Sequence, residues 1–117
     1  MKNYNEKLKT DLKGRAYQYA LKIIEFIDNL PRDISTRIIA GQLLRSATSI
    51  GANIIEAQAS SSKREFINFF HHSLKSANES KFWLGLLKDA NKANREEVEI
   101  LLKETTELGN ILGSSLL

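Results

Sequence analysis

The stretch DISTRIIAGQLLRSATSIGANIIEAQA, residues 33–59, repeats apolar side chains at intervals of three and four residues. This is the period of an amphipathic α-helix. Asp33 and Ser35 are both favourable N-cap residues. We therefore expect a helix over residues 34–59. Its apolar stripe contains Ile39, Leu43, Ala47, Ile50, Ile54 and Ala57.

Three further segments have the same period. The segment 6–29 ends before Pro31, because proline disfavours a helical conformation in the residue before it. Ser62 and Glu65 have the spacing of a capping box and predict a helix over 63–90. Asn94, followed by acidic residues, predicts a last helix over 95–113. The expected core positions are Leu8, Leu12, Ala16, Tyr19, Ile23, Phe26, Leu30, Phe66, Phe69, Phe70, Ser73, Ala77, Leu84, Leu87, Val98, Leu101, Leu102, Thr105, Leu108 and Leu112.

The composition agrees with an all-α chain. There are 117 residues with one proline, six glycines and no cysteine. An all-β chain of this length would carry more turn residues. Short connections between amphipathic helices favour antiparallel neighbours. We expect one domain over residues 1–117, an antiparallel up-down-up-down four-helix bundle. No apolar run is long enough to cross a membrane and no signal-peptide core is present, so we expect a cytoplasmic protein.

A polar stripe runs along the segment 34–59, beside its apolar stripe. Amides, hydroxyls and charged groups alternate there, where an ordinary solvated face usually carries lysine and glutamate. Arg45 and Glu56 lie about three turns apart and cannot pair on one straight helix. Each needs a partner on another helix or another subunit. The stripe is interpreted either as a polar network at a packed junction or binding surface, or as a solvated face.

Residues 42–57, QLLRSATSIGANIIEA, resemble the signature of the 23S rRNA intervening-sequence proteins. The likeness continues through SKREF at 62–66, then Ser73, Ala77, Glu79 and FWL at 82–84. Pro31 stands where that family has a proline. Ala57 departs from the pattern, because the family usually has glycine there. Alanine continues a helix where glycine would help to end it. With these positions we assign a structural polar network to Gln42, Arg45, Ser49, Asn53, Glu56 and Glu79.

The resemblance has consequences for assembly and partners. It implies a four-helix bundle that forms a ring-like homopentamer. A related group, the accessory variability proteins of diversity-generating retroelements, is basic and pentameric and works with a reverse transcriptase and nucleic acid. The resemblance therefore implies self-association, RNA or DNA, and a reverse transcriptase as candidate partners.

The segment 63–90 is apolar on more than one side near its end. Phe82, Trp83 and Leu86 lie opposite the expected core stripe. A helix that is apolar on several faces is either deeply buried or joined to a partner. We interpret these three residues as an oligomer interface. The alternative is that the end of the segment 6–29 covers them.

The charge is unevenly distributed. Residues 1–93 carry 15 basic and 9 acidic side chains, whereas residues 94–117 carry 2 basic and 5 acidic ones. Basic side chains facing phosphate would give salt-dependent, sequence-independent binding. The alternative is a solvated surface of mixed charge, and most aromatic residues have core spacing and are unsuited to stacking on bases. The candidate nucleic-acid-binding residues are Lys7, Lys9, Lys13, Arg15, Arg37, Lys63 and Arg64.

The sequence carries no catalytic motif. His71 and His72 are adjacent and point about 100° apart on a helix, so they cannot chelate one metal ion together. No nucleophile elbow or phosphate-binding glycine loop is present. We expect a non-enzymatic protein without a cofactor or a metal. Our interpretation is a homo-oligomeric scaffold that binds nucleic acid or serves as an accessory protein; the alternative is a protein–protein adaptor that uses the polar stripe and the Phe82 patch.

Overall fold

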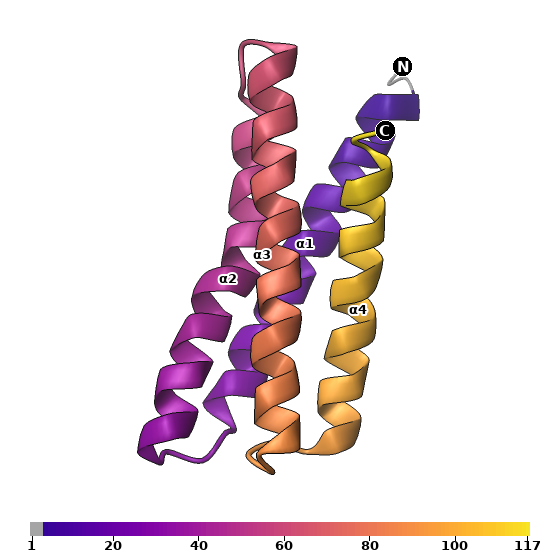
Figure 1. The fold of residues 1–117 in the computed structure, drawn as a ribbon. Helices are drawn as coiled ribbons and strands as arrows, with labels where there is room; N and C mark the ends of the chain where they lie inside the picture. Colours follow the sequence, from indigo (N-terminus) through magenta and orange to yellow (C-terminus); the bar gives the residue numbers. More distant parts are fainter. Residues whose placement is uncertain (1–3) are drawn as a thin grey trace.

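The computed structural model contains four α-helices (Figure 1). They are α1 (Tyr4–Asp28), α2 (Ile34–Gln58), α3 (Lys63–Asp89) and α4 (Arg95–Ser114). The structure describes residues 4–117, with side chains from residue 11 onward. Each helix boundary lies within two residues of the one expected from the sequence.

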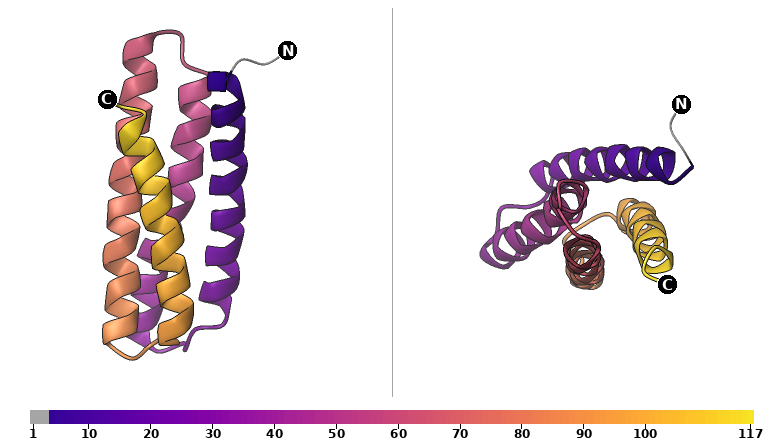
Figure 2. Two further views of the ribbon diagram at one scale, coloured as in Figure 1. Left: turned by 90° about the vertical axis from the view of Figure 1, so that its right-hand side faces the viewer. Right: turned by 90° about the horizontal axis from the view of Figure 1, so that it is seen from above.

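Consecutive helices run in opposite directions, which confirms the antiparallel up-down-up-down bundle (Figure 1). The molecule is elongated, with principal extents of 48 × 23 × 22 Å. Helices α2 and α3 pack over the longest contact, and among the neighbouring pairs α1 and α4 have the smallest. Seen along the bundle, α1 crosses the direction of the other helices (Figure 2). None of the helices in the described residues has an apolar stretch able to span a membrane.

Side-chain caps set the starts of three helices. Asp33, Ser62 and Asn94 each accept a hydrogen bond from the backbone N–H three residues further on. The capping box at α3 differs from the ideal pattern by one residue, because the Glu65 carboxylate accepts from the N–H and hydroxyl of Ser61. These hydrogen bonds lower the pKa of Glu65, the backbone bond from Ser61 most. The residues that predicted these helix starts from the sequence therefore make the capping hydrogen bonds in the structure.

The turn between α3 and α4 is closed by a left-handed residue. Asn91 has φ of 58°, and the Lys92 N–H donates to the Leu87 carbonyl at 2.9 Å. This is the pattern of a Schellman motif, in which asparagine can replace the usual glycine. The turn directs Lys92 back across the bundle, where its Nζ lies 3.0 Å from a carboxylate oxygen of Asp33. One ion pair thus joins the two turns at this end.

The Asp33 carboxylate makes the stability of the protein depend on pH. Hydrogen bonds from Thr36, and next from Lys92, lower its folded-state pKa well below the ordinary value of 3.8. A lowered folded-state pKa contributes stability above the unfolded-state value, and this contribution is lost as the pH falls through the folded-state value. We expect wild type to exceed Asp33→Asn in stability more at about pH 6 than at about pH 2. Urea denaturation at both pH values measures this, and an equal difference at both would contradict it.

The core follows the predicted stripes with a small rotation. In α2, Ala40 is buried while Ile39 is only half-buried. Phe66 and Phe69 are also half-buried and pack against the edge of the core, as does Leu102. Leu8 lies outside the residues whose side chains are described. The core consists of Leu12, Ala16, Tyr19, Ile23, Phe26, Leu43, Ala47, Ile50, Ile54, Ala57, Phe70, Ala77, Leu84, Leu87, Val98, Leu101, Leu108 and Leu112.

Two pairs of buried hydroxyl groups lie in the core, with one residue from each helix. The Ser46 and Ser80 oxygens are 2.8 Å apart, and those of Tyr19 and Thr105 are 2.6 Å apart. The first pair joins α2 to α3, and the second joins α1 to α4. Burial raises the pKa of the Tyr19 phenol to about 12. We name Ser46, Ser80, Tyr19 and Thr105 the hydroxyl pairs.

Candidate interaction site on helices α2 and α3

An ion pair joins the polar stripe of α2 to α3. The Arg45 guanidinium donates to the Glu79 carboxylate at 2.6 Å and to the Gln42 side-chain oxygen at 3.1 Å. The Trp83 indole N–H donates to the same Glu79 oxygen at 2.9 Å. Glu79 and Trp83 lie one turn apart on α3, so the carboxylate fixes the indole while Arg45 fixes the carboxylate. Arg45 therefore has the partner on another helix that the sequence required.

A second polar cluster lies one turn further along α2. The Asn53 amide donates to the Ser49 backbone carbonyl and hydroxyl at 2.8 and 2.9 Å. The Ser76 hydroxyl on α3 donates to the Ser49 hydroxyl at 3.0 Å. Nearby, Ser73 donates to the Ile50 carbonyl at 2.8 Å in the buried contact. Small hydroxyl residues thus line the α2–α3 contact and satisfy one another.

The network assigned from the sequence therefore divides into two clusters, one around Arg45 and one around Ser49, and Glu56 belongs to neither. Glu56 is exposed and makes no hydrogen bond or ion pair with the residues that the structure describes. Sequence reasoning missed Ser76, and it treated Trp83 only as an apolar anchor. The four-residue spacing of Glu79 and Trp83 was the available signal, because such neighbours meet on a helix surface.

The Arg45–Glu79 pair lies at the surface, where ion pairs add about 0–1 kcal/mol. Its role in the structure is to hold the Glu79 carboxylate, which in turn fixes the orientation of the Trp83 indole. The Trp83 ring meets the Phe82 ring edge-on, with centroids 5.0 Å apart. Phe82 is itself 59% exposed and Leu86 is 37% exposed. The polar cluster thus borders an apolar patch formed by Phe82, Trp83 and Leu86.

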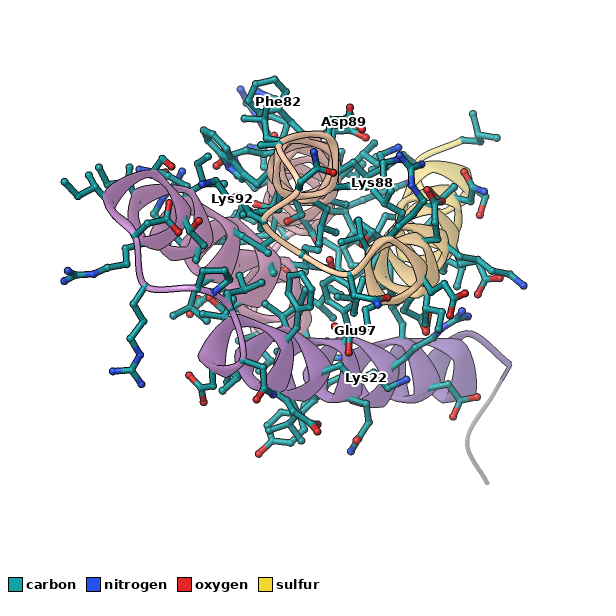
Figure 3. The ribbon with its side chains drawn as sticks, turned by 90° about the horizontal axis from the view of Figure 1, so that it is seen from below. Lys22, Phe82, Lys88, Asp89, Lys92 and Glu97 are labelled. Carbon is teal, nitrogen blue, oxygen red and sulfur yellow. The ribbon has the colours of Figure 1, made fainter. Side chains whose placement is uncertain are left out.

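This apolar patch lies open on the outer side of α3. Figure 3 shows Phe82 pointing away from the bundle, near the end of α3 that carries Asp89. The end of α1 leaves Phe82 and Leu86 exposed. The alternative interpretation of the sequence, in which α1 covers these residues, is therefore wrong for this chain.

The candidate nucleic-acid-binding residues differ in their surroundings. Arg15 pairs with Glu104 at 2.6 Å and also with Glu107, so α4 neutralises its charge. These partners raise the pKa of Arg15, the hydrogen bond to Glu104 most. The side chains of Lys7 and Lys9 lie outside the described residues. The remaining candidates are exposed and form no ion pair with the described residues: Lys13, Arg37, Lys63 and Arg64.

These exposed cations do not gather in one place. Lys63 and Arg64 begin α3, beside the α2–α3 turn. Arg37 lies in the first turn of α2, at the opposite end of the bundle (Figure 1). His71 and His72 are exposed on α3, and no group of three metal-binding side chains occurs among the described residues.

The whole bundle, including both polar clusters, falls within one match to a known family. Residues 9–114 match the family model described as 23S rRNA-intervening sequence protein. The chain belongs to the 23S rRNA-intervening sequence protein family. Its α2 runs one residue past Ala57, the position at which this chain departs from the family's usual glycine.

A solved structure similar to this chain has the same architecture. It is that of a protein of unknown function from the S23 ribosomal protein family of Bacteroides thetaiotaomicron VPI-5482, with 35% sequence identity and a TM-score of 0.82. The alignment covers 90% of this chain and 97% of that one. Among curated proteins, none matches the sequence. Neither the family description nor that of the solved relative names a catalytic activity.

Proposed function

We propose that this 23S rRNA-intervening sequence protein is a non-enzymatic scaffold that assembles with itself and binds nucleic acid. The observation that carries the proposal is the open Phe82 patch. The Trp83 indole is hydrogen-bonded to the Glu79 carboxylate, which Arg45 also binds. It lies next to the exposed Phe82, so the patch is a rigid apolar surface. Aromatic residues of this kind anchor protein interfaces.

A charged residue in this patch should block assembly. Phe82 makes its contacts mostly outside the core, so Phe82→Glu is expected to keep the fold and to convert an oligomer, about five protomers by the family resemblance, into monomers. Light scattering coupled to size exclusion measures the mass, and circular dichroism checks the helices. Tyr17→Glu is the matched control, because Tyr17 is equally exposed on α1. An unchanged mass for Phe82→Glu, or a monomeric wild type, would contradict the proposal.

The nucleic-acid part of the proposal rests on free cations at the start of α3. Lys63 and Arg64 are exposed and form no ion pair with the residues whose side chains the structure describes, and the amino end of a helix favours phosphate. One such pair is a weak attraction, but a cyclic assembly repeats it once per subunit. The binding would be electrostatic and independent of base sequence. Cations from several subunits would then face one phosphate backbone.

The test is binding of short RNA and DNA duplexes at low and high salt. Affinity is expected to fall steeply with salt, and Lys63→Glu/Arg64→Glu to remove most of it. Arg95→Glu/Lys103→Glu, which makes the same change of charge on α4, is the control and should reduce affinity much less. Equal losses in both double variants would show only an effect of net charge and would contradict binding at the start of α3.

The second candidate function is a protein–protein adaptor. The observation that favours it is the border of hydrogen-bonding groups, Gln42 and Arg45, beside the Phe82 patch. By the retroelement resemblance, a reverse transcriptase is the protein partner to test. An adaptor predicts capture of that partner with weak dependence on salt, together with loss of capture in Phe82→Glu. The scaffold function predicts strong salt dependence instead.

A further inference from the structure

A shallow groove lies between α1 and α4 at the end of the bundle that holds the α1–α2 and α3–α4 turns. Its volume is about 190 Å³. Phe26 and Leu101 form a buried floor, and Ile100, 67% exposed, forms one wall. The groove offers apolar surface that no described side chain covers. Its polar lining residues are Lys22, Glu25, Asn29 and Glu97.

The rim of this groove has a net negative charge. Two carboxylates, Glu25 and Glu97, face one ammonium group, that of Lys22. Figure 3 shows Lys22 on α1 and Glu97 on α4 on the two sides of the groove. None of these three groups forms an ion pair within the described residues. The groove therefore fits an apolar group that carries a positive charge beside it.

The same chain presents such a group on α2. Ile34 and Ile38 lie one turn apart and are 77% and 62% exposed. Arg37 lies beside both of them and also has no ion pair among the described residues. Two isoleucines exposed to this degree with a free arginine form a protrusion that nothing in the single chain covers. We name Ile34, Arg37 and Ile38 the α2 protrusion.

The protrusion and the groove lie at the same level along the bundle. The first turn of α2, the end of α1 and the start of α4 all lie at the end of the bundle that contains the α1–α2 turn, with α2 and α4 on different sides of it (Figures 1 and 3). A rotation about an axis parallel to the helices can therefore bring the protrusion of one copy to the groove of the next. Each copy then uses its protrusion toward one neighbour and its groove toward the other. Such a contact between two different surfaces is heterologous, and repeating it by rotation closes a ring.

We propose that Ile34 and Ile38 of one copy insert into the α1–α4 groove of a neighbouring copy, with Arg37 placed against Glu97. The inference rests on the proposed self-assembly and names the surfaces that produce it. The α2 protrusion occurs at the same end of the bundle as Phe82 and Leu86, on the adjacent helix. The two apolar surfaces thus belong to the adjacent helices α2 and α3, whereas the groove belongs to α1 and α4.

Charge reversal tests the pairing in the full-length chain. Arg37→Glu and Glu97→Arg are each expected to lower the oligomer mass at micromolar concentration. The double variant Arg37→Glu/Glu97→Arg is expected to restore it, because every contact regains opposite charges. Glu96→Arg is the matched control for the acidic first turn of α4, since Glu96 does not line the groove. It should leave the mass unchanged.

The apolar part of the contact has its own variant. Ile34→Ser/Ile38→Ser is expected to give monomers that remain helical, whereas Ile55→Ser at the other end of α2 keeps the oligomer. A monomeric wild type would refute self-assembly itself. A wild-type oligomer whose mass survives the double serine variant, or a double charge reversal that fails to restore the mass, would overturn this contact while leaving self-assembly intact.

Discussion

Tyr19→Ala is expected to lower the free energy of unfolding by about 3–5 kcal/mol, the range for removing a large buried aromatic side chain. Tyr19 is 1% exposed and lies at the centre of the core. The substitution removes the ring from between α1 and α4, the neighbouring pair of helices with the smallest contact. It also removes a hydrogen-bond partner of Thr105. Urea denaturation followed by circular dichroism measures the change.

Tyr19→Phe separates the ring from its hydroxyl. Thr105 still donates to the Leu101 carbonyl at 2.6 Å, so the loss of the phenol leaves that group partnered. We expect Tyr19→Phe to lower the free energy of unfolding by only about 0.5–1.5 kcal/mol. If both variants had the same effect, the contribution of the ring to packing would be refuted.

Ser80→Leu is the second substitution with a large expected effect, a loss of about 2–4 kcal/mol. Ser80 is fully buried in the long α2–α3 contact, where its oxygen lies 2.8 Å from that of Ser46. A leucine needs space that only separation of the two helices can provide. The same separation would lengthen the bond between Arg45 and Glu79, which directly precede Ser46 and Ser80 in the chain.

The control for this position is Ser80→Ala, which removes the hydroxyl and adds no volume. We expect it to lower the free energy of unfolding by about 1 kcal/mol, because Ser46 keeps its bond to the Leu43 carbonyl. Tryptophan fluorescence reports on Trp83 in the same samples. A leucine variant as stable as wild type would show that α2 and α3 are not closely packed at Ser80.

The sequence was sufficient for the fold because each of its signals is local. Asp33, Ser62 and Asn94 cap helices through backbone groups only three residues away, so their effect is visible in the order of residues. The three- and four-residue spacing of apolar side chains is local in the same sense. The exact rotation of the helices escaped. In α2, for example, Ile39 and Ala40 are both apolar, and packing against neighbouring helices chooses between them.

The site was only partly predictable because its contacts join different helices. Arg45 could be seen to need a partner, and the family resemblance supplied Glu79 as a member of the network. The hydroxyl pairs were missed, since Ser46 and Ser80 look like ordinary small polar residues and only the fold brings them together. Arg15 shows the opposite case. It looked like a free cation until α4 placed Glu104 and Glu107 beside it.

The hydroxyl pairs also bear on how the bundle comes apart. Because each hydroxyl pair joins two helices, a helix that detaches alone breaks a hydrogen bond across the core, a net loss of about 0.5–1.5 kcal/mol. Detachment of any one of the four helices therefore costs free energy in the core. Amide hydrogen exchange should accordingly show the central turns of all four helices opening together, as a single cooperative unit, while the helix ends exchange independently.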